Sequence, residues 1–419
     1  MIEPYYQEDG IEIYNADCLE ILKQLPDESV DAIITDPPYN LIQNNSGFER
    51  GGNNPNSPYT RTAKGGFMGK EWDGTGIAFK IDLWKECLRV IKPGAHLLAF
   101  GGTRTYHRMT CAIEDAGFEI RDMLEWIYAS GFPKSLNVGK AYDKKMGNER
   151  EKIKKPVSYP DSDDWGIPNP TTAKNPTSYK TETDKVNAGA GYRWQSKGNS
   201  EWEGFGTSLK PAHEPIVLAR KPLEEKTVVE NVLKYGTGAL DIDGCRISCG
   251  TEHFRGEVKR LTKDSGEWET KLGFVKPFVA TDSPLGRFPA NLLVTDDALN
   301  DGTITKTILQ DEGSKSRYFD IDVWAEKWGL LQYPKASKSE KDSGETNNNH
   351  LTVKPVHLIA YLVRLVSKEG DVVLDPFMGS GTTLMACKML GRKGIGVEKE
   401  KDYCEIAVKR IDSIPNKLF

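Results

Sequence analysis

The residues Asp36-Pro37-Pro38-Tyr39 directly follow an apolar run, residues 30–35, which predicts a buried strand. A carboxylate and a proline carbonyl at a strand end are two acceptors that can hold both N–H groups of an exocyclic amine. The two prolines stiffen the turn and leave their carbonyl groups free. Tyr39 adds a ring on which an extruded base can stack. The tetrapeptide alone also fits an ordinary tight turn, so its interpretation depends on a second motif.

That second motif lies far downstream, where Asp375-Pro376-Phe377-Met378-Gly379-Ser380-Gly381-Thr382-Thr383 follows the apolar run 372–374. Its glycines allow a ligand to approach the backbone, and a helix starting at Thr382 would offer free N–H groups. Glu398 ends the next expected strand 398 − 375 = 23 residues later, the spacing of a ribose-binding carboxylate. A phosphate-binding P-loop would need a lysine after Gly381, and a dinucleotide fingerprint would need glycine at Leu384. The motif therefore predicts a nucleoside cofactor at a strand end.

Taken together, the two motifs predict methyl transfer to a base nitrogen, which needs acceptors and in-line geometry but no covalent enzyme intermediate. Methylation of a ring carbon would require a thiolate, typically after a proline, and no cysteine here follows one. Cys245, Cys249 and His253 resemble part of a zinc site, but a fourth ligand is not evident, so no metal is expected.

The elements that would position these motifs alternate between strand and helix, which predicts a parallel α/β sheet. Strands are expected at residues 11–17, 30–35, 96–100, 118–129, 214–220, 371–374 and 394–398. Helices are expected at residues 18–25, 78–91, 103–116, 356–366, 382–390 and 402–411. The Asn-, Gly- and Ser-rich stretch 41–70 is expected to be a mobile substrate loop attached to the Asp36 turn.

Composition fits a large core with a second, smaller domain in 419 residues, and the net charge of −5 does not exclude DNA binding through a local basic patch. The segment 134–155 carries eight basic and three acidic residues, 8 − 3 = +5, although a solvated charged helix would look the same. Seven scattered cysteines, with no signal sequence or membrane-length apolar run, predict a reducing cytoplasm and no membrane association.

With these motifs in this order, the chain resembles the amino-methyltransferases that modify adenine N6 or cytosine N4 in DNA with S-adenosylmethionine. The Thr352-x-Lys354-Pro segment before the glycine turn indicates the beta permutation class. Three further segments are similar to phage and prophage DNA methylases: Ser130-Gly131-Phe132-Pro133-Lys134-Ser135, Leu209-Lys210-Pro211-Ala212-His213-Glu214-Pro215 and Arg287-Phe288-Pro289-Ala290-Asn291.

The resemblance implies a role for each matching residue. The catalytic motif would be Asp36, Pro37, Pro38 and Tyr39, and the cofactor turn would be Asp375, Phe377, Gly379, Gly381 and Thr382. Glu398 would bind the ribose of S-adenosylmethionine, Asp17 would face its adenine, and Thr352 and Lys354 would face its carboxylate.

The implied fold is a circularly permuted Rossmann-like methyltransferase sheet with helices on both faces and an inserted target-recognition domain. Its parts would be a catalytic half at 1–130, an irregular basic insertion at 131–210, a returning strand at 211–222, a recognition domain at 223–345 and a cofactor half at 346–419.

Double-stranded DNA is the expected partner, in a bacterial cell or a phage-infected host, and the family also allows a homodimer and a cognate restriction endonuclease. Adenine N6 is preferred because family members with Asp first in the four-residue motif mostly act on adenine; cytosine N4 is the alternative. RNA and protein glutamine are weaker alternatives. A non-catalytic cofactor- or DNA-binding module is disfavoured by the intact Asp36 and Tyr39.

Overall fold

A computed structural model of the chain separates into two compact units, residues 1–130 with 212–419, and residues 131–211. The residues described are 2–40, 75–129, 131, 135–156, 192–248, 286–295, 297–300, 305–306, 312–330 and 353–414. The predicted loop 41–70 lies outside them.

The first unit is built on a nine-stranded sheet of described residues, in the order β1-β2-β13-β12-β3-β4-β8-β5-β9. The strands from β2 to β4 in this order are mutually parallel, whereas β8 runs antiparallel to both β4 and β5. Their bounds are β1 Tyr6–Glu8, β2 Ile11–Asn15, β3 Val30–Thr35, β4 Ile91–Phe100, β5 Glu119–Ile127, β8 His213–Arg220, β9 Leu292–Val294, β12 Val372–Asp375 and β13 Lys393–Glu398.

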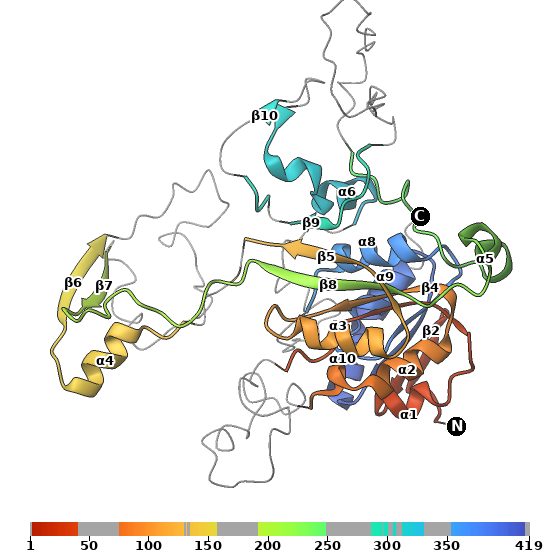
Figure 1. Cartoon of the computed structure of the whole chain (residues 1–419), viewed down its shortest axis with the longest axis horizontal. Helices are drawn as coiled ribbons and strands as arrows, with labels where there is room; N and C mark the ends of the chain where they lie inside the picture. The colour runs from red at the N-terminus through yellow and green to blue at the C-terminus, as the bar shows by residue number, and fades with distance from the viewer. Residues whose placement is uncertain are drawn as a thin grey trace, which may run out of the picture. The chain divides into compact units, whose positions relative to one another are not determined.

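The strand order confirms the predicted permuted fold. The C-terminal strands β12 and β13 insert between β2 and β3, so the two ends of the chain complete one sheet. Figure 1 shows the blue C-terminal segment packed with the red and orange N-terminal one. Leu374 pairs with Ile33 on one side and Ile395 on the other, which aligns the carboxyl ends of β3, β12 and β13 at one edge. Ligands of open α/β sheets bind outside this edge.

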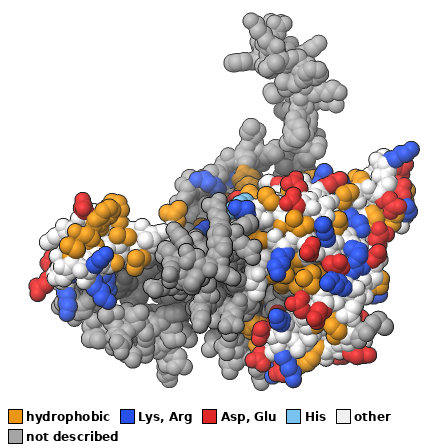
Figure 2. Space-filling model, turned by 60° about the horizontal axis from the view of Figure 1, so that its bottom comes forward, with side chains coloured by type: hydrophobic (Ala, Val, Ile, Leu, Met, Phe, Trp, Pro, Cys, Tyr) orange, Lys and Arg blue, Asp and Glu red, His pale blue; other side chains and the backbone are white. Residues whose placement is uncertain are grey.

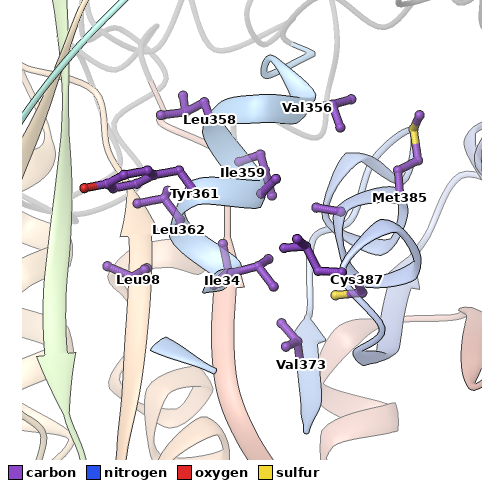
Figure 3. Packing of buried hydrophobic residues seen from close by; sticks show 14 of the residues in the cluster. Ile34, Leu98, Val356, Leu358, Ile359, Tyr361, Leu362, Val373, Met385 and Cys387 are labelled. Atoms are coloured by element: carbon purple, nitrogen blue, oxygen red, sulfur yellow. The ribbon is translucent and has the colours of Figure 1, made fainter. Parts of the chain in front are cut away.

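Helices cover both faces of the sheet, because successive strand residues alternate between two cores. Ile34 and Leu98 belong to the core under α8 and α9, whereas Ile33 and Leu97 belong to the core under α2 and α3. Figure 3 shows α8 packing its apolar side chains against the strand residues Ile34 and Leu98. The helices are α1 Cys18–Leu22, α2 Ile81–Val90, α3 Tyr106–Asp115, α8 Val356–Val366, α9 Thr382–Met389 and α10 Lys401–Asp412, with the 3-10 turn η4 Ile77–Phe79.

The described part of the stretch 223–345, expected to be a recognition domain, belongs to the first unit. Its strand β9 pairs with β5 of the main sheet, and Trp324 is fully buried in the core beneath α8. Its other elements are α5 Val228–Tyr235, η6 Lys315–Tyr318, α6 Ile321–Lys327 and the two-stranded sheet of β10 Thr305–Lys306 and β11 Glu312–Gly313. The target-recognition role of this stretch stays a prediction.

The second unit contains regular structure where the sequence suggested an irregular insertion. Helix α4, Val138–Met146, is capped by the Asn137 side chain, and β6, Glu151–Pro156, pairs antiparallel with β7, Tyr192–Lys197. Arg150 joins the helix to the remainder of the unit, because it contacts Asp143 and donates to Glu203 Oε1 at 2.9 Å. Figure 2 shows hydrophobic side chains gathered on the visible face of this unit beside Lys and Arg.

Two of the element boundaries that differ from the prediction have an evident physical reason. Strand β4 begins at Ile91 and passes through Lys92-Pro93-Gly94, where a register shift against β3 accommodates residues that usually end an element. Helix α3 begins at Tyr106, and Thr105 uses its hydroxyl elsewhere, as described below. No described helix has the length and apolarity needed to cross a membrane.

Candidate active site

The two sequence motifs lie side by side at the carboxyl edge of the sheet. Strands β3 and β12 are parallel neighbours, so the turns that follow Thr35 and Asp375 emerge together. The Thr35 hydroxyl donates to Asp375 Oδ1 at 2.8 Å, across 340 positions of sequence. The predicted proximity of the Asp36 and Phe377 turns thus follows from strand pairing.

Asp375 organises the glycine turn from within. Its Oδ1 also accepts the Phe377 N–H at 3.0 Å, and its Oδ2 accepts the Thr383 hydroxyl at 2.6 Å. Burial raises the pKa of Asp375 to about 6, although the hydroxyls of Thr383 and Thr35 oppose the rise. Because both oxygens are occupied, this carboxylate shapes the turn that would receive the cofactor.

The turn requires glycine for conformation and for space. Gly379 and Gly381 have positive φ values of 54° and 82°. A Cβ atom added at Gly381 would lie 2.8 Å from the Cβ of Ala407 in α10. Arg410, from the same helix and fully buried, donates to the Ser380 carbonyl at 2.6 Å. Helix α10 therefore packs directly against the cofactor turn and holds its backbone.

Glu398 lies at the end of β13, the strand next to this turn. Its Oε2 accepts the Gly379 N–H at 3.1 Å and its Oε1 accepts the Glu400 N–H at 2.8 Å. Burial raises the pKa of Glu398 to about 7, against the lowering effect of these backbone donors. On the other side of β13, Asp17 follows β2 and caps α1 through Leu19 N–H at 3.0 Å.

These residues fit a nucleoside cofactor. The left-handed glycines, the start of α9 and the Glu398 carboxyl come to one edge of the sheet, and Asp17 lies beyond the adjacent strand β2. The individual roles of Phe377, Thr382, Glu398 and Asp17 toward that cofactor remain predictions. Thr352 lies outside the described residues.

A buried charged cluster adjoins the Asp36 turn. The ammonium group of Lys354 contacts Asp36 Oδ2 and lies 3.2 Å from Glu214 Oε2 and 3.1 Å from the Tyr39 hydroxyl. The Tyr39 hydroxyl donates to Glu214 Oε2 at 3.0 Å. The other oxygen of Asp36, Oδ1, is buried and has no hydrogen-bond partner among the described residues. An unpaired buried acceptor is costly, so this atom is poised for a donor from a ligand.

The charges of the cluster determine the ionisation of Lys354 and Asp36. Burial alone would lower the pKa of Lys354, but the charges of Asp36 and Glu214 raise it above its ordinary value, so Lys354 is a cation at neutral pH. Burial raises the pKa of Asp36; the charge of Lys354 opposes that rise and the charge of Glu214 adds to it. Two carboxylates around one ammonium leave the site with a net negative charge when all three are ionised.

The Tyr39 backbone is also fixed. The Thr105 hydroxyl, just before α3, donates to the Tyr39 carbonyl at 2.8 Å. The Tyr128 hydroxyl, just after β5, donates to Glu214 Oε1 at 3.3 Å. The ring of Tyr39 packs against the core on the α8 side of the sheet and is partly buried.

Sequence reasoning did not identify Glu214 or Arg410 as site residues. The signal for Glu214 was an acidic residue heading the apolar strand 215–219, but only an antiparallel β8 brings that amino end to the carboxyl edge. Arg410 carried no signal beyond a basic residue in the last turn of a helix. Lys354 was expected to face the cofactor carboxylate; in the structure its ammonium contacts Asp36.

The chain is similar to known DNA methylases in sequence. The model of the DNA methylase family N6_N4_Mtase matches residues 30–409. The chain is 25% identical to the type II methyltransferase M.HindIII of Haemophilus influenzae over 426 residues, which cover 97% of each protein. It is 46% identical to M2.DpnII of Streptococcus pneumoniae over 92 residues, 22% of this chain and 30% of that one. The solved PvuII DNA methyltransferase, described as cytosine-N4-specific, is similar with a TM-score of 0.43 and 14% identity, covering 97% of this chain and 88% of that chain.

Proposed function

Because the chain belongs to the N6_N4_Mtase family of DNA methylases, we propose that it transfers a methyl group from S-adenosylmethionine to adenine N6 of a base turned out of double-stranded DNA. The observation that carries the proposal is Asp36 Oδ1, a buried acceptor that no described residue satisfies, beside the predicted cofactor turn. Adenine is proposed over cytosine because the four-residue motif begins with Asp.

The chain's residues would act on the base amine. Asp36 Oδ1 and the Pro37 carbonyl accept its two N–H groups, which concentrates the nitrogen lone pair outside the ring. S-adenosylmethionine supplies a methyl group on a sulfonium whose sulfur keeps the bonding electron pair. As the N–C bond forms, the amine becomes positively charged, and the net negative cluster around Lys354 stabilises that charge. The surplus N–H proton then leaves toward Asp36 or water.

Isotope transfer to unmethylated DNA tests this proposal. Enzyme incubated with methyl-tritiated S-adenosylmethionine should label DNA, and nucleoside analysis should find N6-methyladenine. Asp36→Asn keeps the shape of the side chain but replaces an acceptor by a donor, so we expect a loss of about 100- to 1,000-fold in rate. Its cofactor affinity should stay within about threefold of wild type.

The control is Asp402→Asn, an exposed aspartate in the first turn of α10, which should leave the rate unchanged. N4-methylcytosine in place of N6-methyladenine would correct the base. Absence of any DNA label, or full activity of Asp36→Asn, would contradict the proposal.

A further inference from the structure

The ammonium group of Lys354 interacts with the proposed catalytic motif, through Asp36 and Tyr39. Its side chain is only 7% exposed, and its three N–H donors face three acceptors, Asp36 Oδ2, Glu214 Oε2 and the Tyr39 hydroxyl. A cation with all its donors engaged at a buried site has a fixed position. The nitrogen also lies 4.8 Å from the centre of the Phe100 ring, which closes the cluster on the sheet side.

Glu214 joins the cluster from a different strand. One of its oxygens lies near Lys354 and accepts the Tyr39 hydroxyl, and the other accepts the Tyr128 hydroxyl. It therefore fixes the far end of the Tyr39 side chain and the position of the ammonium that holds Asp36. Neither Lys354 nor Glu214 has to touch the base to have this effect.

We propose that Lys354 and Glu214 are positioning residues for methyl transfer: Lys354 holds Asp36 by Oδ2 so that Oδ1 faces the base amine, and Glu214 holds Lys354 and Tyr39. This proposal rests on the proposed function for its chemistry. It differs from the sequence expectation, in which Lys354 binds the cofactor carboxylate. With its three N–H donors directed at Asp36, Glu214 and the Tyr39 hydroxyl, Lys354 has none left for the carboxylate of the cofactor.

The arrangement makes opposite predictions for two substitutions. Lys354→Met removes the positive charge beside Asp36, so the pKa of Asp36 should rise, whereas Glu214→Gln removes a negative charge and should lower it. We expect shifts of about one pH unit or more in each direction. Among the described residues, the charged and titratable groups around Asp36 are Lys354 before α8, Glu214 in β8, Tyr39 in the same turn, Tyr128 after β5 and Asp375 in β12.

Two readouts measure these shifts. The first is a carbon-13 NMR titration of aspartate-labelled full-length enzyme, with Asp36→Asn identifying the Asp36 signal; it requires no turnover. The second is the acidic limb of single-turnover methylation against pH, which should move up in Lys354→Met and down in Glu214→Gln. Lys354→Arg keeps the charge and should return the limb toward the wild-type position.

Matched controls distinguish a failure of the positioning role from a failure of the proposed methyltransferase activity. The exposed pair Lys234 and Glu225, 2.7 Å apart, gives the matched controls Lys234→Met and Glu225→Gln, which should shift neither readout. Cofactor affinity of Lys354→Met should stay within about threefold. Tenfold weaker cofactor binding with an unmoved Asp36 titration would assign Lys354 to the cofactor and overturn the inference. Opposite NMR shifts in an enzyme that methylates no DNA would uphold the cluster and overturn the proposed function.

Discussion

Buried Asp375 and half-buried Glu398, at the same sheet edge, differ in how many of their acceptor sites are already occupied. Both oxygens of Asp375 accept hydrogen bonds from within the protein, from the hydroxyls of Thr35 and Thr383 and from the Phe377 N–H, so this residue is part of the scaffold. Glu398 accepts the N–H groups of Gly379 and Glu400, one on each oxygen, and each carboxylate oxygen can accept more than one donor. Chemistry at a single residue thus depends on which acceptor sites the fold has already filled.

The ionisation of Glu398 predicts a pH dependence of cofactor binding. Its pKa of about 7 means that it is an anion above that pH and neutral below it. In its predicted role Glu398 accepts hydrogen bonds from the ribose hydroxyls, and these are stronger to the anion, so affinity for S-adenosylmethionine should fall as the pH decreases through about 7. Calorimetric titration between pH 6 and pH 8, roughly one unit either side of that pKa, measures it.

Two variants define the outcome of that titration. Glu398→Gln should bind weakly with no inflection near this pH, whereas Glu405→Gln, an exposed glutamate on α10, should retain the wild-type curve. An unchanged inflection in Glu398→Gln would assign the titration to another group.

At the scale of elements, the direction of one strand decides the composition of the site. Parallel strands bring their carboxyl ends to the ligand edge, which places Asp36, Asp375 and Glu398 together. Strand β8 runs the other way, so its amino end reaches the same edge and delivers Glu214. Helix α10 contributes from outside the sheet, by packing Ala407 against Gly381 and by holding the Ser380 carbonyl with Arg410.

The contact between α10 and the glycine turn predicts an unequal cost for two glycine substitutions. Gly381 and Gly370 have φ values of 82° and 84°, but a Cβ atom at Gly370 meets nothing within 4 Å. Gly370→Ala should cost only the left-handed backbone term, about 1 kcal/mol. Gly381→Ala adds a clash with Ala407 and should cost about 2 to 4 kcal/mol. Denaturant unfolding measures both.

Cofactor titration extends this comparison. Gly381→Ala should weaken S-adenosylmethionine binding, because relief of the clash moves the turn, and Gly370→Ala should not. Equal losses of unfolding free energy in the two variants would mean that α10 moves away from the added Cβ atom without destabilising the protein.

At the scale of the whole molecule, the two units are stabilised differently. The first contains two hydrophobic cores on the faces of one sheet. The second is organised around the nearly buried pair of Arg150 and Asp143, and it leaves apolar side chains such as Met146 and Phe205 exposed. Lys144 and Lys145 project from the last turn of α4 and are exposed. This surface suits contact with DNA, where phosphates meet lysines.

Charge reversal tests the DNA contact of the second unit. Lys144→Glu with Lys145→Glu should weaken DNA binding and reduce the slope of log affinity against log salt by roughly 0.9 per lost phosphate contact. Fluorescence anisotropy at several salt concentrations measures the slope. The matched control reverses Lys401 and Lys409, exposed on α10 of the first unit. Equal effects of the two double variants would indicate a change in net charge alone.

The sequence by itself determined the motifs and the alternation of strands and helices, because periodicity and turn chemistry are local properties of the chain. The permuted sheet was implied by the resemblance to the beta-class amino-methyltransferases. It also predicted that the Asp36 and Phe377 turns adjoin, since parallel strands share a carboxyl edge. Only the tertiary structure decided that Lys354 contacts Asp36, that Glu214 completes the cluster and that Arg410 holds the turn. These contacts depend on strand direction and on the packing of distant helices, which no local pattern of residues specifies.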